Sequence, residues 1–207
     1  MPAFTIVGND GSGKTTITEY IRKNFSKMDP LIFDMKASKP FFGIIFNIRN
    51  FLKKLNSVIL IKKIFFLNSL ISFIGENLDF FDKYIKYKIG MAWADAGYGL
   101  TVFERYPTDR IRGEFPNSKS KIFPLEQFFP FPDGMIYLDV TARVSIHRKK
   151  KDKHTLSEMT SKRENYLKLI KEFDEVKLIH SKTSFKEKIK NIKDYIFELN
   201  KKKKKIT

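Results

Sequence analysis

The segment Thr5–Thr16, TIVGNDGSGKTT, decides the fold of this chain. A short apolar strand runs into a loop with three glycines, and a lysine and two threonines then open a helix. That helix carries Ile17, Ile21 and Phe25 on one face, which is the spacing of a helix packed on a core. The eight residues Gly8–Thr15 match the pattern G-x-x-x-x-G-K-[ST] at every fixed position. The motif lies between a predicted strand and a predicted helix, which is the context that the pattern requires.

The chemistry of this loop predicts a binding site for a nucleoside triphosphate. Glycines let the backbone adopt conformations closed to other residues, so that successive amide groups converge on phosphate oxygens. The free amides at the helix start add to the same positive field. Lys14 can reach the β and γ phosphates of ATP, and the Thr15 hydroxyl can ligate Mg²⁺. The residues expected to bind the nucleotide are Gly8, Asn9, Gly11, Ser12, Gly13, Lys14, Thr15 and Thr16.

Further strands and helices alternate along the chain, which is the pattern of a parallel sheet covered by helices. Thr155 and Glu158 have capping-box spacing for a helix that runs to about Phe173, and Ser184 and Glu187 repeat that spacing before the last helix. We expect four strands after the first, at Pro30–Asp34, Leu100–Glu104, Gly134–Val140 and Val176–His180, and a helix from about Leu78 to Ala92. The sequence therefore predicts an α/β fold with five strands.

Length and composition limit the classes of protein to which the chain can belong. Its 207 residues, 42% of them hydrophobic, suffice for one domain, which we place at residues 1–200. The absence of cysteine excludes disulfides and thiolate chemistry, and three scattered histidines argue against a transition-metal site. The N-terminus shows no secretory pattern, so we expect a cytoplasmic protein.

The net charge of +17 favours anionic partners without choosing among nucleotides, nucleic acid and membranes. Residues 201–207 are mostly lysine and are expected to form a disordered basic tail. Residues 41–75 are rich in Phe, Ile and Leu, but their longest uncharged run has 12 residues, too few to span a bilayer. We interpret 41–75 as a helical apolar insertion packed on the sheet or at a dimer contact. An interfacial membrane helix is the alternative, which we do not favour.

Several further motifs, taken with Asp10 in the loop, resemble the thymidylate kinase family of P-loop nucleoside monophosphate kinases. They are VFERYP from Val102, PDGMIYLDV from Pro132, and the segment Val144–Leu169. The resemblance covers the chain outside 41–75. It implies a three-layer α/β/α sandwich with strand order 2-3-1-4-5, a basic lid over 148–160, ATP and Mg²⁺ as cofactors, and a homodimer.

The resemblance also implies roles for individual residues. Asp10 matches the loop aspartate that contacts the acceptor sugar, and Lys83 matches an arginine that binds the acceptor phosphate. Glu104 and Arg105 match an acidic residue and an arginine at the end of strand 3, which support Mg²⁺ and hold the reacting phosphates. Arg148 matches an arginine against the adenine of ATP.

The basic lid is expected to supply transition-state charge. The family places its catalytic arginine in the phosphate loop or in the lid, and Gly11 occupies the loop position here, which favours the lid. Closure of a cationic lid would exclude water and stabilise the moving phosphoryl group. The residues assigned to catalysis are Lys14, Arg105, Arg148, Lys150 and Lys151.

The acceptor site departs from the family pattern. DMKASKP at Asp34–Pro40 replaces the family motif Arg-Glu-Pro-Gly, and Glu114 stands where the family has a glutamine that reads thymine. An ionised glutamate only accepts hydrogen bonds, so this site should disfavour the carbonyls of thymine. The acceptor is therefore a nucleoside monophosphate, a nucleoside or another small molecule.

A different class of function remains open from the residues. The chain could be a basic protein that uses ATP as a switch and associates with a membrane or nucleic acid, given its charge and its apolar segment. No nucleic-acid-binding module is recognisable, so this reading ranks below the kinase.

Overall fold

The computed structural model describes residues 1–35, 47–48, 51, 65–105, 131–148 and 154–206 of the chain. Five strands form one sheet in the order β2-β3-β1-β4-β5, and every pairing is parallel. The sheet and its order were both predicted and are confirmed. The strands are β1 (Ala3–Val7), β2 (Leu31–Asp34), β3 (Thr101–Glu104), β4 (Gly134–Asp139) and β5 (Val176–His180).

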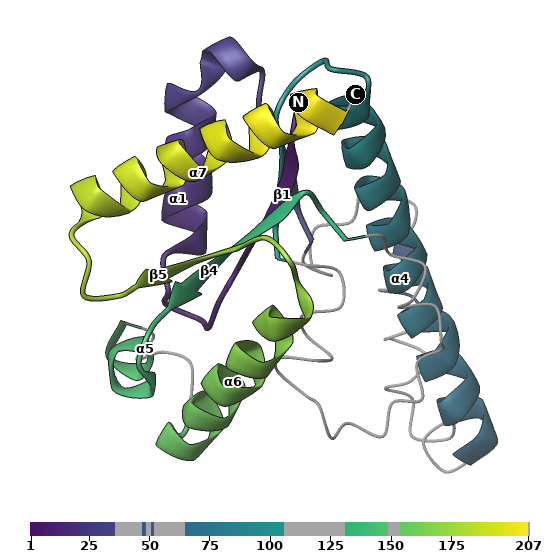
Figure 1. The fold of residues 1–207 in the computed structure, drawn as a ribbon. Helices are drawn as coiled ribbons and strands as arrows, with labels where there is room; N and C mark the ends of the chain where they lie inside the picture. Colours follow the sequence, from purple (N-terminus) through teal and green to yellow (C-terminus); the bar gives the residue numbers. More distant parts are fainter. Residues whose placement is uncertain (36–46, 49–50, 52–64, 106–130, 149–153, 207) are drawn as a thin grey trace.

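Helices cover both faces of this sheet (Figure 1). Because strand side chains alternate between faces, β1 sends Phe4 and Ile6 to one side and Ala3 and Val7 to the other. The first side packs against α1 (Lys14–Asn24) and α7 (Phe185–Ile206). The second side packs against α4 (Phe65–Asp95) and α6 (Leu156–Leu169). The result is a three-layer α/β/α sandwich with an apolar cluster on each face.

Short helices complete the described fold. The 3₁₀ turns η1 (Ser26–Met28) and η4 (Ile170–Glu172) and the helix α5 (Ala142–Arg148) lie in the connections. The Thr155 hydroxyl accepts from the backbone of Glu158, and the Glu158 carboxylate accepts from the backbone of Thr155. This reciprocal capping box starts α6 as predicted. The α-helical part ends at Leu169, before the predicted end, because the chain tightens there into η4.

Two predicted boundaries differ from the structure. Residues 65–75, assigned to the apolar insertion, form the first turns of α4, so the insertion has no boundary at Gly75. Residues 201–206, predicted as a disordered tail, continue α7, since Lys203 is anchored by Asp95 and Asp133. The remaining calls on 41–46, 49–50 and 52–64 fall outside the described residues. Within the described part of the chain, no helix has the length and apolar character needed to cross a bilayer.

Candidate active site

The phosphate loop joins β1 to α1 at the carboxyl edge of the sheet, where parallel α/β folds bind ligands. Gly8 has φ 144°, and a Cβ there would lie 2.5 Å from the carbonyl oxygen of Leu138 on β4. Gly13 has φ 96° and is the left-handed N-cap of α1. Both positions require glycine, because other residues rarely adopt such φ values. The loop therefore lies directly against the sheet and continues into the first turn of α1, whose free amides favour an anion.

Lys14 lies inside the loop and is 6% exposed. Its Nζ donates to the carbonyl oxygens of Gly8 at 2.6 Å and Asn9 at 2.9 Å, and it reaches Ser12 Oγ at 3.5 Å. An ammonium with carbonyl partners is satisfied without an anion, yet it lies where loop lysines meet phosphates. A bound polyphosphate would exchange these neutral acceptors for charged ones, which form stronger hydrogen bonds with an ammonium.

Glu104 lies at the carboxyl end of β3, beside the first turn of α1. Its Oε1 accepts from the Thr15 hydroxyl at 2.7 Å, and its Oε2 accepts from the Thr18 hydroxyl at 3.3 Å. This pair of oxygen donors fits Mg²⁺, which binds few protein groups and keeps waters and substrate phosphates as its other ligands. Thr15 would hold the ion through its hydroxyl, and Glu104 would orient the ion's waters.

Asp10 and Arg105 form an ion pair across the mouth of the loop, with Arg105 Nη2 donating to Asp10 Oδ1 at 3.0 Å. Burial alone would raise the pKa of Asp10, but the positive charges of Lys14, Arg105 and Lys162 outweigh it and hold this pKa below its usual value. Arg105 has φ 84°, a strained backbone for a residue with a side chain. The pair therefore presents an ionised carboxylate and a guanidinium at the end of β3.

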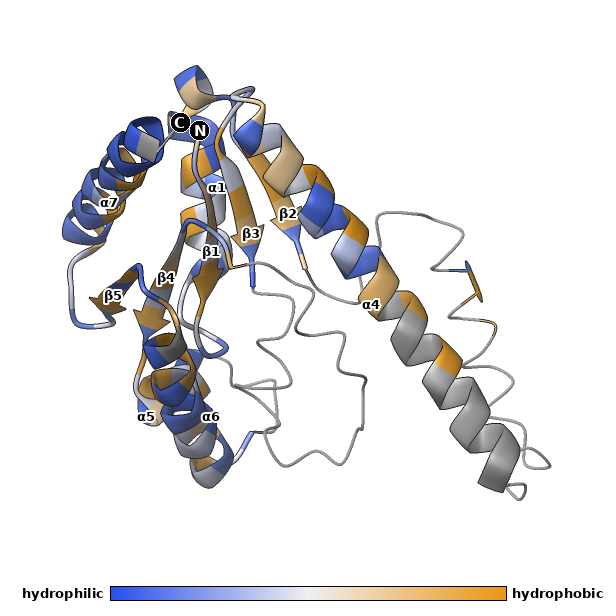
Figure 2. Cartoon of the chain, turned by 45° about the vertical axis from the view of Figure 1, so that its right-hand side comes forward, coloured by the Kyte–Doolittle hydropathy of each residue, from blue (hydrophilic) through white to orange (hydrophobic). Residues whose placement is uncertain are grey.

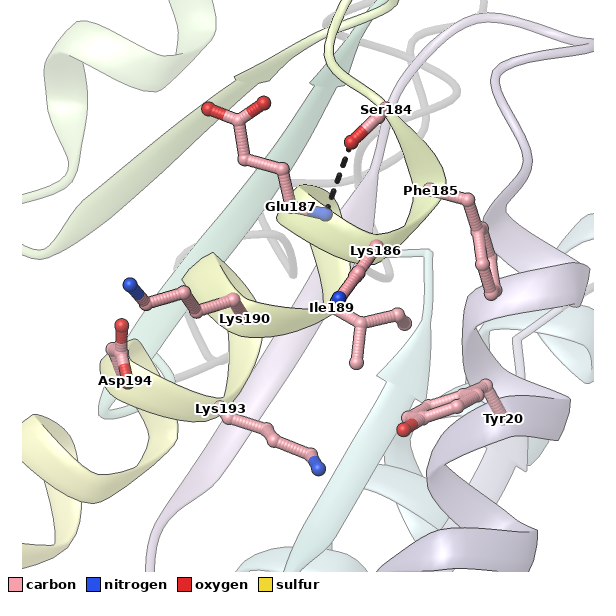
Figure 3. Close-up of a pocket in the computed structure, with 9 residues that line it drawn as sticks. All are labelled: Tyr20, Ser184, Phe185, Lys186, Glu187, Ile189, Lys190, Lys193 and Asp194. Atoms are coloured by element: carbon pink, nitrogen blue, oxygen red, sulfur yellow. Dashed lines mark hydrogen bonds between the residues drawn. The ribbon is translucent and has the colours of Figure 1, made fainter.

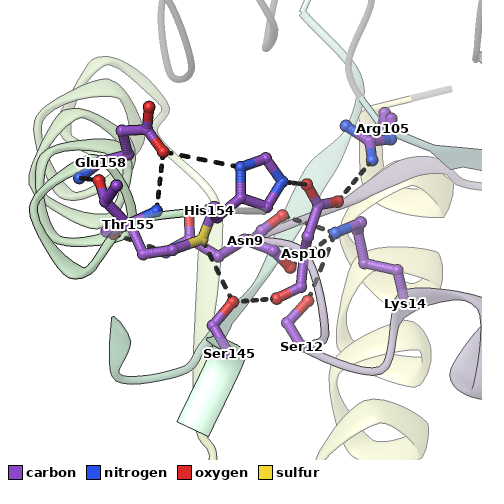
Figure 4. Close-up of polar contacts among 11 residues, drawn as sticks. Asn9, Asp10, Ser12, Lys14, Arg105, Ser145, His154, Thr155 and Glu158 are labelled. Carbon is purple, nitrogen blue, oxygen red and sulfur yellow. Dashed lines mark hydrogen bonds and ion pairs between the residues drawn. The ribbon is translucent and has the colours of Figure 1, made fainter. Parts of the chain in front are cut away.

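A histidine side chain faces the same carboxylate (Figure 4). Nε2 of His154 lies 4.0 Å from Asp10 Oδ2, and Nδ1 of His154 lies 3.9 Å from a carboxylate oxygen of Glu158. His154 immediately precedes the capping box of α6, so the start of that helix points toward the phosphate loop. The sequence analysis missed this histidine, because its partner Asp10 lies 144 positions away in the chain.

Helices α5 and α6 brace the outer side of the loop. Ser145 Oγ on α5 donates to the carbonyl of Asp10, and Arg148 Nη1 at the end of α5 donates to the carbonyl of Gly11 at 3.0 Å. Asn9 Nδ2 donates to the carbonyl of Met159 on α6 at 3.2 Å. The carbonyls of Asp10 and Gly11 thus accept from α5, whereas the carbonyl of Asn9 accepts from the amide of Ser12 within the loop at 3.2 Å. The predicted adenine contact of Arg148 stays a prediction; the contact seen is with the loop backbone.

A further polar cluster joins α6 to the carboxyl ends of β4 and β5. Arg163 donates to both carboxylate oxygens of Asp139, at 2.6 and 2.9 Å, and His180 Nδ1 lies 3.2 Å from Asp139 Oδ2. The hydrogen bonds from Arg163 hold the pKa of Asp139 below its usual value. No spacing pattern identified these three residues, although Asp139 is the acid that ends the apolar run of β4.

The structure brings most of the predicted site residues together, and the binding roles of Lys83 and Thr16 stay predictions. Lys83 is half-buried on α4, on the face of the sheet opposite α1, and Thr16 is exposed in the first turn of α1. Lys150, Lys151 and Glu114 lie outside the described residues, as do residues 149–153 of the lid. The residues gathered at the carboxyl edge are Gly8, Asn9, Asp10, Gly11, Ser12, Gly13, Lys14, Thr15, Glu104, Arg105 and Arg148.

Comparison with known proteins adds a structural relative. No protein-family model and no curated protein matches this sequence. Among solved structures, the chain is similar to the deoxyadenosine kinase from M. mycoides with bound dATP, with a TM-score of 0.55 and 16% sequence identity. The match covers 96% of this chain and 99% of that one. At this identity the likeness concerns the fold alone: the chain shares the overall fold of that structure, which in this chain is the five-stranded parallel sheet described above.

Proposed function

We propose that this protein is an ATP-dependent phosphotransferase that moves the γ-phosphate of ATP to a nucleotide-like small acceptor. The observation that carries the proposal is the arrangement at the carboxyl edge of the sheet. Lys14 lies within the phosphate loop at the start of α1, and Asp10 of the same loop forms an ion pair with Arg105 at the end of β3. Phosphoryl transfer asks mainly for alignment and for positive charge around the moving group, and this edge supplies both.

Each residue then has a defined task. The loop amides and Lys14 bind the β and γ phosphates of ATP, while Thr15 and Glu104 hold Mg²⁺, which neutralises phosphate charge when it is bound. Arg105 exchanges its contact with Asp10 for the reacting phosphates. Asp10 then accepts a hydrogen bond from a hydroxyl of the acceptor sugar. The basic lid, with Arg148, Lys150 and Lys151, closes over the donor.

The low pKa of Asp10 bears on the choice of acceptor. A carboxylate that stays ionised is a weak base, which suits it to orient a hydroxyl and not to remove its proton. A nucleoside monophosphate offers an already ionised phosphate and needs no base. We therefore place monophosphates first among the acceptors and nucleosides second. The M. mycoides enzyme, named a deoxyadenosine kinase, supports including deoxyadenosine among the nucleosides.

The test is a panel of acceptors with purified protein, MgATP and a measurement of ADP formation. The panel contains dAMP, dTMP, dUMP, dCMP and UMP, together with the matching nucleosides. We expect one acceptor class to stimulate ADP formation, and Lys14→Ala to abolish that stimulation. Binding of MgATP without stimulation by any acceptor would contradict the phosphotransferase and favour a protein that uses ATP as a switch.

A further inference from the structure

One exposed row of side chains on α7 carries five lysines and a phenylalanine. Its members follow at intervals of four, three, four, four and three residues, which places them on one side of the helix. At 1.5 Å per residue the row is about 27 Å long. It lies away from the apolar face that packs on the sheet, and the outward side of α7 is hydrophilic (Figure 2). The row, called the lysine row below, consists of Lys186, Lys190, Lys193, Phe197, Lys201 and Lys204, all exposed.

No acidic residue belongs to the lysine row. The acids of α7 near it, Glu187, Asp194 and Glu198, follow one another at seven and four residues and occupy a neighbouring row. Phe197, at the middle of the lysine row, is 55% exposed. An exposed phenyl ring with a lysine one turn away on either side combines an apolar and a cationic contact on one line.

An apolar groove adjoins the amino-terminal half of the lysine row (Figure 3). Its volume is about 700 Å³. Tyr20 of α1 faces Phe185 and Ile189 of α7, and the rings of Tyr20 and Phe185 meet edge to face at 5.9 Å. Lys193 extends toward the same space, with its ammonium 5.9 Å from the ring of Phe25. Three lysines of the row line this groove together with two acids, Glu187 and Asp194, and the rest of its wall is mainly apolar.

We propose that the lysine row and this groove form a docking surface for an anionic phospholipid membrane. This inference goes beyond the proposed phosphotransferase and does not depend on it. The lysines would lie at the level of the anionic headgroups, while Phe197 and the apolar groove would meet the acyl boundary. A row of exposed cations on a helix whose other side is fixed on a sheet can lie flat on such a surface without any change of fold.

The composition of the row favours a lipid surface over nucleic acid. All five of its cations are lysines, whose ammonium groups act as point charges and need no fixed geometry in the partner. Readers of nucleic acid rely on arginine for bidentate contacts and on several aromatic rings for stacking. The lysine row has no arginine and a single aromatic ring. It thus matches a diffuse anionic surface with an apolar interior.

The experiment is cosedimentation of the full-length protein with vesicles of phosphatidylcholine alone or mixed with phosphatidylglycerol, at low and high salt. We expect retention only on the anionic vesicles and only at low salt, because surface charges are screened as ionic strength rises. In the triple variant Lys190→Glu, Lys193→Glu and Lys201→Glu, the partition coefficient should fall at least about a hundred-fold, since each lysine near an anionic surface contributes about five-fold. Phe197→Ser should weaken partitioning onto the anionic vesicles several-fold at low salt.

The matched control reverses three exposed lysines on the other face of the sheet, by Lys88→Glu, Lys168→Glu and Lys171→Glu. It changes the net charge equally and should keep most of the vesicle binding. Equal thermal unfolding midpoints for both triples exclude misfolding as the cause of a loss. The proposal would be overturned if neutral vesicles retained the protein as well as anionic vesicles do. It would also be overturned if the control triple lost as much vesicle binding as the lysine-row triple. Binding to a DNA or RNA duplex through the same lysines without binding to vesicles would overturn it as well.

Discussion

The two ends of the sheet hold their charged groups in different ways. At the carboxyl end, Lys14 contacts main-chain carbonyls and Asp10 contacts Arg105, so each group has a partner that a phosphate or a sugar can replace. At the amino end, Lys203 lies 2.7 Å from carboxylate oxygens of both Asp95 and Asp133. Those contacts join α7, α4 and the start of β4, close to where the two chain termini meet (Figure 1).

The difference separates function from stability. Contacts that a ligand can replace keep the site folded and its groups ionised until the ligand binds. Substitutions at the carboxyl end should therefore alter turnover more than the free energy of unfolding. At the amino end, the contacts tie separate elements of the fold together. Asp133 also accepts from the backbone of Ala3 at 2.7 Å, and the terminal amine donates to the carbonyl of Ala94. Changes at that end should alter unfolding more than turnover.

Glu104→Gln should give the largest effect on turnover. The amide keeps the size of the side chain and can still accept from Thr15, but it loses the charge that orients the waters of a bound Mg²⁺. We expect ADP formation to fall about a hundred-fold, as for loss of a group that supports a metal. The unfolding free energy should change by less than about 1 kcal/mol.

The rise of the unfolding midpoint on addition of a ligand gives a second measurement on Glu104→Gln. ADP should raise the unfolding midpoint of the parent protein more when Mg²⁺ is present, because ligands stabilise the state that binds them. Glu104→Gln should lose that dependence on Mg²⁺ and keep the response to ADP alone. Undiminished turnover, or an unchanged response to Mg²⁺, would remove Glu104 from the proposed metal site.

Asp139→Asn tests the contact between Asp139 and Arg163, which lies at the carboxyl end but is expected to stabilise the fold and not to bind a ligand. Loss of its charged hydrogen bonds with Arg163 should lower the unfolding free energy at neutral pH by about 2 kcal/mol. The folded-state pKa of Asp139 is lowered, so this stability is present above the unfolded pKa, about 3.9, and is lost as the pH falls through the folded value.

Urea unfolding at several pH values measures this prediction. The difference in unfolding free energy between the parent and Asp139→Asn should begin to narrow below about pH 4, where the unfolded parent is protonated first, and should close as the pH falls through the lowered folded pKa of Asp139. Asp174→Asn, at an exposed position, is the control and should stay within about 0.5 kcal/mol of the parent. A gap that stays constant down to low pH would mean that the charge of Asp139 contributes nothing.

Lys203→Met should lower the unfolding free energy by about 1.5 kcal/mol. Its side chain is 17% exposed, and two carboxylates raise its pKa although burial alone would lower it. Because Asp95 is largely exposed, its share of the loss is small, and most of the effect should come from Asp133. The adjacent exposed Lys204 gives the control, Lys204→Met, which should change stability by less than about 0.5 kcal/mol. If Lys203→Met and Lys204→Met changed the free energy of unfolding equally, the contacts of Lys203 with Asp95 and Asp133 would not stabilise the end of α7.

Local signals predicted most of the fold. The phosphate loop is a contiguous motif with fixed spacing, the strands are short buried runs, and the capping box of α6 spans four residues. Each of these depends on neighbours in the chain, which a sequence displays directly.

Contacts between distant residues could not be predicted in this way. Composition favoured disorder for the lysine-rich end because it gave no sign of Asp95 and Asp133, which lie 108 and 70 positions away. In the same way the pairing of Arg163 with Asp139 and the hydrogen bond from Ser145 to Asp10 arise only once β4, α5 and α6 meet the phosphate loop. The motif identified the phosphate-binding half of the site, whereas the residues that brace it required the fold.

Ser145→Ala should give the smallest effect and sharpen the contrast between the two ends. Ser145 is 1% exposed, and its hydroxyl bonds the carbonyl of Asp10 within the phosphate loop. Its loss leaves a partly buried carbonyl without that donor, at a cost of about 1 kcal/mol. If the brace positions the loop, the cost should appear as a rise of about five-fold in the KM for ATP, with kcat nearly unchanged.

A purely structural role for Ser145 would give a different result. The unfolding midpoint would then fall while the KM for ATP stayed at the parent value. Arg143→Lys is the control, because Arg143 is exposed on the same helix, and this change keeps the charge and should change neither quantity. Measuring both quantities in both variants therefore decides whether α5 only packs beside the phosphate loop or sets its shape for ATP.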